Sequence, residues 1–115
     1  MQYMLLIYHN EKTPLSSAEQ SQMMQEYMMF TQDIVKTGKF KAGDRLEFSN
    51  SAKTVQVRNG KTATKNGPCA ETTEQLGGYY VVEAKDLDEA VAIAARIPGA
   101  KHGSVEVRPI AQMSR

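Results

Sequence analysis

The chain contains one cysteine, no run of like charges and no long hydrophobic run. One cysteine excludes an intrachain disulfide and a multi-cysteine metal cage, so we expect a reduced, cytoplasmic setting. A formal net charge of +1 over 115 residues gives no global field that would attract nucleic acid or an anionic membrane. The apolar run at the start is short and has no basic segment before it, which predicts a strand rather than a signal peptide or a membrane span. We therefore expect neither nucleic acid nor membrane among the partners.

Motifs for nucleotide and metal binding are also lacking. The sequence has no glycine-rich phosphate loop, no dinucleotide fingerprint and no nucleic-acid-binding motif. The two histidines, His9 and His102, are not accompanied by carboxylates at metal-ligand spacing. The sequence therefore predicts no cofactor and no metal.

The composition is that of one folded domain. Hydrophobic residues make up 41% of the chain and charged residues 23%, which is ordinary for a globular protein and excludes disorder. A chain of 115 residues can bury a core without disulfides or metals. Neither a long linker nor an internal repeat divides it, so we predict a single domain over residues 1–115.

Two helices are predicted from capping signals and apolar spacing. Ser16 followed by Glu19 is a capping-box pattern, and apolar residues recur at helical spacing from there until Gly38. Asp86 begins a second helix that Pro98-Gly99 ends. Strands are predicted over residues 3–9, 40–48, 54–58, 61–65, 79–84 and 104–108.

The order of these elements predicts an α+β fold. Two βαβ units flank a hairpin with Asn59-Gly60 at its turn, the strongest local hairpin signal. With right-handed crossovers, this order gives a ferredoxin-like antiparallel sheet with an inserted hairpin and both helices on one face.

The predicted sheet has an apolar face that its own helices cannot cover. The first strand, residues 3–9, is apolar on both faces, and strand 79–84 is nearly so. Two helices cover only one face of a sheet, and an uncovered apolar face calls for a partner. We therefore predict a two-fold homodimer whose sheets pack face to face. The alternative is that the hairpin folds over its own sheet.

The segment from Asn66 to Tyr80 combines turn residues, two carboxylates and the single thiol. Gly77-Gly78 is expected to end this loop before strand 79–84. Loops held on a rigid scaffold concentrate binding and catalytic groups. Four methionines, at positions 23, 24, 28 and 29 of the first helix, favour core and interface filling over an adaptable surface.

Residues 66–78, which read Asn-Gly-Pro-Cys-Ala-Glu-Thr-Thr-Glu-Gln-Leu-Gly-Gly, resemble the motif of the DGPF family of YCII-related domains. Residues 3–8, 95–98 and 103–109 are similar to that family too, so the resemblance covers nearly the whole chain. It implies a dimeric ferredoxin-like α+β barrel, in a superfamily of small enzymes and proteins of unknown role. Some relatives are fused to or encoded beside extracytoplasmic-function sigma factors, which implies regulation.

Two departures from the motif bear on chemistry. Asn66 replaces the family's aspartate and cannot titrate, so we expect it to initiate a turn. Cys69 replaces a phenylalanine, and a small buried cysteine is favoured over a nucleophile. Better-studied relatives are thought to use a His–Asp pair in a cleft; the resemblance places Tyr27 where that histidine is expected and offers Asp44 as a counterpart of the aspartate.

Six side chains are candidates for a site. Carboxylates and imidazoles suit general acid–base chemistry, and a guanidinium suits an anionic group. The acid–base candidates are Asp44, Glu71 and His102, and the substrate-binding candidates are Tyr27, Tyr79 and Arg108. A solvated loop position is the alternative for Glu71, and an intersubunit salt bridge is the alternative for Arg108.

Two functions follow from these candidates. The first is binding of a small polar molecule in a cleft at the dimer's sheet interface, with proton transfer of the lyase or isomerase kind. The alternative is a non-catalytic regulatory or partner-binding module, linked to extracytoplasmic-function sigma factors as the resemblance implies.

Overall fold

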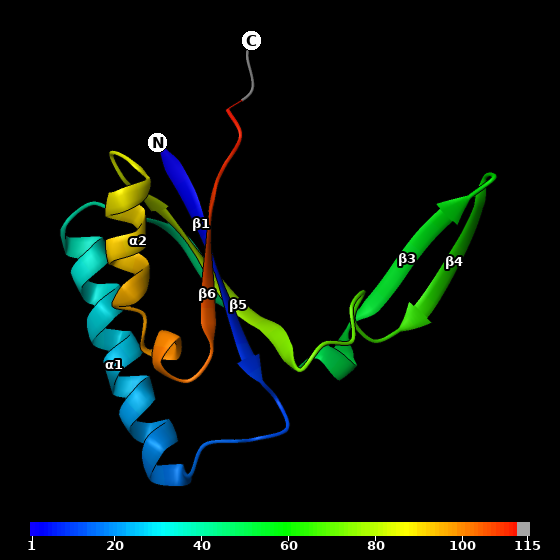
Figure 1. Ribbon diagram of the computed structural model, residues 1–115, viewed down its shortest axis with the longest axis horizontal. Helices are drawn as coiled ribbons and strands as arrows, with labels where there is room; N and C mark the ends of the chain where they lie inside the picture. The colour runs from blue at the N-terminus through cyan, green and yellow to red at the C-terminus, as the bar shows by residue number, and fades with distance from the viewer. Residues whose placement is uncertain (113–115) are drawn as a thin grey trace.

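The computed structural model describes residues 1–112, which form a helix layer on a sheet and a hairpin that projects from it (Figure 1). The elements in chain order are β1 (Gln2–Asn10), α1 (Ser17–Lys36), β2 (Phe40–Arg45), β3 (Lys53–Arg58), β4 (Lys61–Asn66), β5 (Glu74–Glu83), α2 (Leu87–Ala95) and β6 (Ser104–Pro109). Two 3-10 turns, η1 (Ser49–Ser51) and η2 (Pro98–Lys101), follow β2 and α2. Within residues 1–112, the four-stranded sheet has the order β2-β5-β1-β6 with antiparallel neighbours, and β3 pairs only with β4. The predicted α+β, ferredoxin-like arrangement with an inserted hairpin is confirmed.

Helix α1 begins and ends at the predicted signals. The Ser16 hydroxyl accepts from the Glu19 N–H at 3.2 Å, and the Glu19 carboxylate accepts from the Ser16 N–H at 3.0 Å. These bonds lower the pKa of Glu19. At the other end, the Gly38 N–H donates to the Val35 carbonyl and the Lys39 N–H to the Ile34 carbonyl, which satisfies carbonyls that the helix leaves unpaired.

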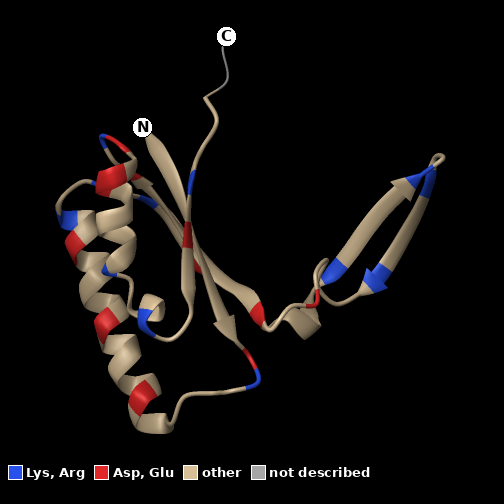
Figure 2. Ribbon diagram, viewed as in Figure 1, with Lys and Arg blue, Asp and Glu red and all other residues tan. Residues whose placement is uncertain are grey.

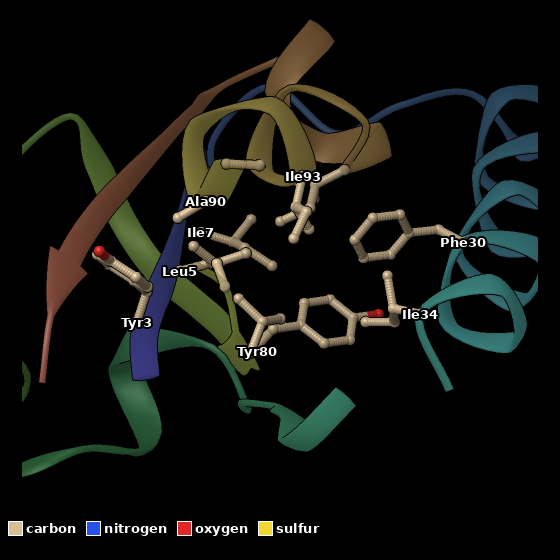
Figure 3. Packing of buried hydrophobic residues seen from close by; sticks show 12 residues of the cluster. Tyr3, Leu5, Ile7, Phe30, Ile34, Tyr80, Ala90 and Ile93 are labelled. Atoms are coloured by element: carbon tan, nitrogen blue, oxygen red, sulfur yellow. The ribbon is translucent and has the colours of Figure 1, made fainter. Parts of the chain in front are cut away.

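One face of the sheet and the inner sides of both helices form the core (Figure 3). Phe30 of α1 meets Tyr80 of β5 edge to face, with ring centroids 5.2 Å apart. The Tyr80 hydroxyl is 2.7 Å from the Thr31 hydroxyl, so its polar atom is paired where the ring is buried. The largest fully buried side chains are Leu5, Ile34, Val82 and Ile97.

The other face of the sheet is covered by no helix of the described chain (Figure 1). Along β1, Tyr3, Leu5 and Ile7 are buried in the core, whereas the alternating residues Met4, Leu6 and Tyr8 are only half-buried. The first strand is therefore apolar on both faces, as its sequence shows, but buried on one. This second surface is called the open face below.

The hairpin of β3 and β4 projects away from the end of β5, on the side opposite the helices, and does not fold over the open face (Figure 1). Asn59 and Gly60 form its turn with φ of 53° and 74°, both in the left-handed region that a tight two-residue hairpin turn requires. The predicted turn is thus confirmed, and the alternative in which the hairpin covers its own sheet is wrong for residues 1–112.

Two strand boundaries differ from the prediction by more than one residue. β5 begins at Glu74 instead of Tyr79, so Gly77 and Gly78 lie inside the strand and do not end a loop. The β1–β5 register shifts between Ile7 and Tyr8, which leaves Gly77 at a bulge, a position where glycine is common. β2 ends at Arg45, three residues before the predicted Phe48.

Three of the four methionines of α1 lie outside the core, and their predicted place in an interface stays a prediction. Met24, Met28 and Met29 are 61%, 58% and 70% exposed, so they do not fill the core of the chain. Only Met23 is half-buried.

The buried and exposed sides of α1 provide a matched test at neighbouring positions. Ile34 is fully buried and Val35 is 54% exposed. We expect Ile34→Ala to lower the free energy of unfolding by about 2–5 kcal/mol, through lost apolar burial and a cavity. Val35→Ala should change it by less than about 0.5 kcal/mol. Urea unfolding at one fixed protein concentration measures both, and equal effects would contradict the core described here.

Candidate functional site

A row of four side chains crosses the open face from one sheet edge to the other. The register pairs Asp44 of β2 with Tyr79 of β5, Tyr79 with Leu6 of β1, and Leu6 with Glu106 of β6. Directly opposed residues of antiparallel strands point to the same face, so these side chains are neighbours. The row brings together two carboxylates, a phenol and an apolar contact.

Asp44 and Tyr79 form a hydrogen-bonded pair in this row. The Tyr79 hydroxyl donates to the Asp44 carboxylate at 2.9 Å. This bond, with the charge of Asp44, raises the pKa of Tyr79 above its ordinary value. The phenol therefore acts as a hydrogen-bond donor, and the bond uses one oxygen, Oδ2, of the Asp44 carboxylate.

Two glycines allow β2 to lie close enough for this pair. A Cβ on Gly78 would be 3.0 Å from the Asp44 carbonyl oxygen, and one on Gly43 would be 2.8 Å from Cδ1 of Tyr80. Contacts this short are rare for a side chain, so larger residues would push the strands apart. Gly78, a residue of the segment that resembles the DGPF motif, thus helps to position Asp44.

A second row lies beside the first on the open face. The register pairs Met4 of β1 with Val81 of β5 and with Arg108 of β6. The Arg108 guanidinium forms an ion pair with Glu106, yet its side chain is 70% exposed. An exposed ion pair contributes little stability, so Arg108 can exchange Glu106 for an anionic ligand or a partner's carboxylate at small cost.

A polar cluster lies at the end of the sheet where β1 ends and β5 and β6 begin. The Ser104 hydroxyl donates to the Glu74 carboxylate at 2.9 Å. A Cβ on Gly77 would be 2.5 Å from the His9 ring, whose centroid is 6.2 Å from that of Phe48. Gly77 therefore makes room for His9, which sequence reasoning did not place in a site. Gly77 and His9 lie far apart in the chain, so no local sequence pattern shows that they meet.

The other candidates do not join the Asp44–Tyr79 row. Tyr27 lies on the helix side, where its hydroxyl accepts from the Gly99 N–H at 3.2 Å and burial raises its pKa. His102 follows η2 and is exposed. Glu71 is exposed in the loop before β5, eight positions before Tyr79. Their proposed roles stay predictions.

The two substituted motif positions are on the surface. Asn66 is the last residue of β4, where it pairs with Lys53. Cys69 is exposed, so the prediction of a small buried cysteine is wrong. It lies in the loop between β4 and β5, in which no residue is buried.

A hollow of about 440 Å³ lies away from the row, at the other end of β5. Two ion pairs line it: Lys39 with Glu89 at 3.4 Å, and the N-terminal amine of Met1 with Glu83. This hollow does not include Asp44 or Tyr79. Within residues 1–112 no three His, Cys, Asp or Glu side chains gather closely enough to hold a metal ion, and no helix there is long and apolar enough to cross a membrane.

Sequence comparisons match nearly the whole chain. The model of the YCII-related domain matches residues 1–114. An uncharacterized protein of Rhizobium meliloti (strain 1021) is 35% identical, covering 96% of this chain and 93% of that protein.

A solved structure shares the fold over nearly its full length. It is 5-chloro-2-hydroxyhydroquinone dehydrochlorinase from Burkholderia phenoliruptrix AC1100, in complex with 2,5-dihydroxybenzoquinone. The TM-score is 0.52 at 12% identity, covering 98% of this chain and 96% of that one. At this identity the similarity describes the fold alone.

The Asp44–Tyr79 pair predicts a change in tyrosine titration. Asp44→Asn removes the charge that raises the pKa of Tyr79, so that pKa should fall toward about 10. The hydrogen bond that raises this pKa stabilises the folded protein while Tyr79 is protonated. Its contribution to stability is present below about pH 10 and is lost as the pH rises through the pKa of Tyr79 in the folded protein. Substitution by asparagine should remove that stability.

NMR titration of ¹³C-labelled tyrosine measures this change, and Tyr79→Phe assigns the resonance. Glu106→Gln is the control, because Glu106 lies on the open face but contacts Arg108. An unchanged Tyr79 pKa in Asp44→Asn would show that the pair does not form in solution.

Proposed function

This chain belongs to the YCII-related domain family, and we propose that it binds a small polar organic molecule on the open face, between two copies of the chain, and transfers a proton there. The observation that carries the proposal is the Asp44–Tyr79 hydrogen bond on a face that its own helices leave uncovered. Polar groups that converge on an apolar surface are typical of small-molecule sites.

The proposed chemistry divides between the two members of the pair. Asp44 accepts a proton from the bound molecule at a carboxylate oxygen and later returns it, as in lyase or isomerase reactions. Tyr79 stays protonated and donates a hydrogen bond to the oxygen on which negative charge develops. Arg108 holds an anionic group of the molecule in place of Glu106.

Two copies of the chain are part of this proposal. Met4, Leu6 and Val81 leave an apolar strip on the open face, bordered by Asp44, Glu106 and Arg108. A second open face packed on the first would remove this strip from water and close the space above Asp44. An isologous two-fold arrangement is the commonest way for a chain to do this.

The ligand class is suggested by the fold neighbour. That dehydrochlorinase holds 2,5-dihydroxybenzoquinone, a flat ring with acidic oxygens. Such a molecule would fit between two sheets, with its ring on Leu6 and its oxygens toward Tyr79 and Arg108. Hydroxylated rings are therefore the first probes to test.

A partner-binding module is the second candidate function. It is favoured by the exposed Met24, Met28 and Met29 of α1, because methionine is common on adaptable binding surfaces. In that case the open face would hold no small molecule, and the partner, such as an extracytoplasmic-function sigma factor, would bind through α1.

Ligand binding can be tested with 2,5-dihydroxybenzoquinone and a panel of hydroxylated aromatic acids. We expect at least one probe to raise the melting temperature and to bind in calorimetry. Asp44→Asn and Arg108→Gln should each weaken that binding at least tenfold, since each removes a charged hydrogen-bond partner. Asp88→Asn, at an exposed position of α2, is the matched control and should bind like the parent.

Glu71→Gln in the same assay tests the loop carboxylate separately. If no probe binds the parent chain, the small-molecule proposal fails in favour of the partner-binding module. If binding is unchanged in Asp44→Asn, the site lies elsewhere.

The dimer can be tested by light scattering after size-exclusion chromatography. We expect a mass of twice the 12.8 kDa chain at micromolar concentration. Leu6→Glu should raise the dissociation constant at least tenfold, because it places a charge in the centre of the packed face. Val35→Glu, on the outer side of α1, should leave it unchanged. A monomeric parent would refute the dimer.

A further inference from the structure

The hairpin of β3 and β4, residues 53–66, is an arm with two different faces. Its register pairs Val55 with Thr64 and Val57 with Thr62, so four β-branched side chains share one face. The opposite face carries Gln56, Arg58, Lys61, Ala63 and Lys65. The arm is therefore amphipathic, although neither face contacts the core.

The apolar face of the arm is uncovered in the single chain. Val55 and Val57 are 58% and 57% exposed, and every residue of β4 is exposed. The arm is closed at its base, where the Gly67 N–H donates to the Ala52 carbonyl at 2.8 Å. A two-stranded hairpin alone in water is marginally stable, so its valine face gains from burial against a second surface.

The arm and the rest of the chain carry opposite charge. Four of the 14 basic residues lie in residues 53–66 and none of the 13 acidic ones, so the arm has a formal charge of +4 (Figure 2). The rest of the chain has 10 basic and 13 acidic residues and a formal charge of −3. The arm of one copy and the body of another therefore attract one another at long range, although Arg58, Lys61 and Lys65 lie on the face opposite the valines.

The arm enlarges the surface that each copy can offer to a partner. On the open face, four strands about 4.8 Å apart and about 20 Å long span roughly 400 Å² in plan. One face of the arm, with two strands of six residues, adds roughly 200 Å² in plan. A dimer in which both arms take part therefore has about half as much contact surface again as one formed by the sheets alone.

We infer that the arm of each copy lies against the body of a second copy of this chain, with Val55 and Val57 in the contact. The inference rests on the dimer proposed above and identifies a second part of its interface. By two-fold symmetry the contact occurs twice, so each subunit is held by its partner's arm as well as by its sheet. The arm's cations add attraction that weakens with salt.

The test is the dimer dissociation constant of arm variants, measured by analytical ultracentrifugation. Val55→Ser with Val57→Ser should raise it at least tenfold relative to the parent. Gln56→Ser with Ala63→Ser, a cross-strand pair on the opposite face, is the matched control and should stay within twofold. Lys61→Glu with Lys65→Glu should weaken the dimer at 50 mM salt, and the difference should shrink at 500 mM.

A second measurement covers the case in which the serine variant unfolds the arm. Hydrogen exchange of the parent should show stronger protection of amides in residues 53–66 above the dissociation constant than below it. The inference would be overturned by protection that does not depend on concentration, or by a serine variant whose dissociation constant is within twofold of the parent's. Either result would leave the sheet dimer intact. A parent that is monomeric at all concentrations would refute the dimer and the arm contact together.

Discussion

Two helices cover one side of a four-stranded sheet, and burial of that side supplies the core on which the other features depend. The central strands β1 and β5 carry apolar residues on both sides. The side that lacks helices therefore has hydrophobic area beside the polar side chains of the cross-strand pairs. Apolar area with a few convergent polar groups is the usual setting of small-molecule binding. The position of the proposed site is therefore a consequence of how the chain divides its helices between the two faces.

Strand β5 connects this scaffold to the candidate site. It lies between β1 and β2, and its two adjacent glycines, Gly77 and Gly78, permit close approach on both sides. Gly77 accommodates the His9 ring and Gly78 the carbonyl of Asp44. The segment that resembles the DGPF motif thus acts mainly through geometry: its glycines fix where neighbouring strands lie, while its carboxylate Glu71 is in an exposed loop.

Local features of the chain were predictable from the sequence, and long-range ones were not. The Ser16 capping box and the Asn59-Gly60 turn depend on residues a few positions apart, and both form as predicted. The predicted start of β5 was wrong because a pair of glycines indicates a turn when only neighbouring residues are considered. Gly77 instead lies at a bulge, which forms through the pairing of β5 with β1. Asp44 and Tyr79 were both named from the sequence, but for different roles. The two residues lie 35 positions apart in the chain, and the strand register that brings them together is not encoded in any local pattern. The exposure of Cys69 depends in the same way on where its loop lies.

The pairing of β1 has a consequence for how this protein is made. Leu6 pairs with Tyr79, which is synthesised 73 positions later, whereas the hairpin of β3 and β4 needs only its own residues. At about 5–20 residues per second, a ribosome needs several seconds to cover that interval, while a hairpin forms in about 1–10 μs. The most apolar strand therefore emerges early and stays without its neighbours until most of the chain exists. During those seconds it is an unpaired strand that other nascent chains can pair with, so the rate of translation affects how much of the protein folds correctly.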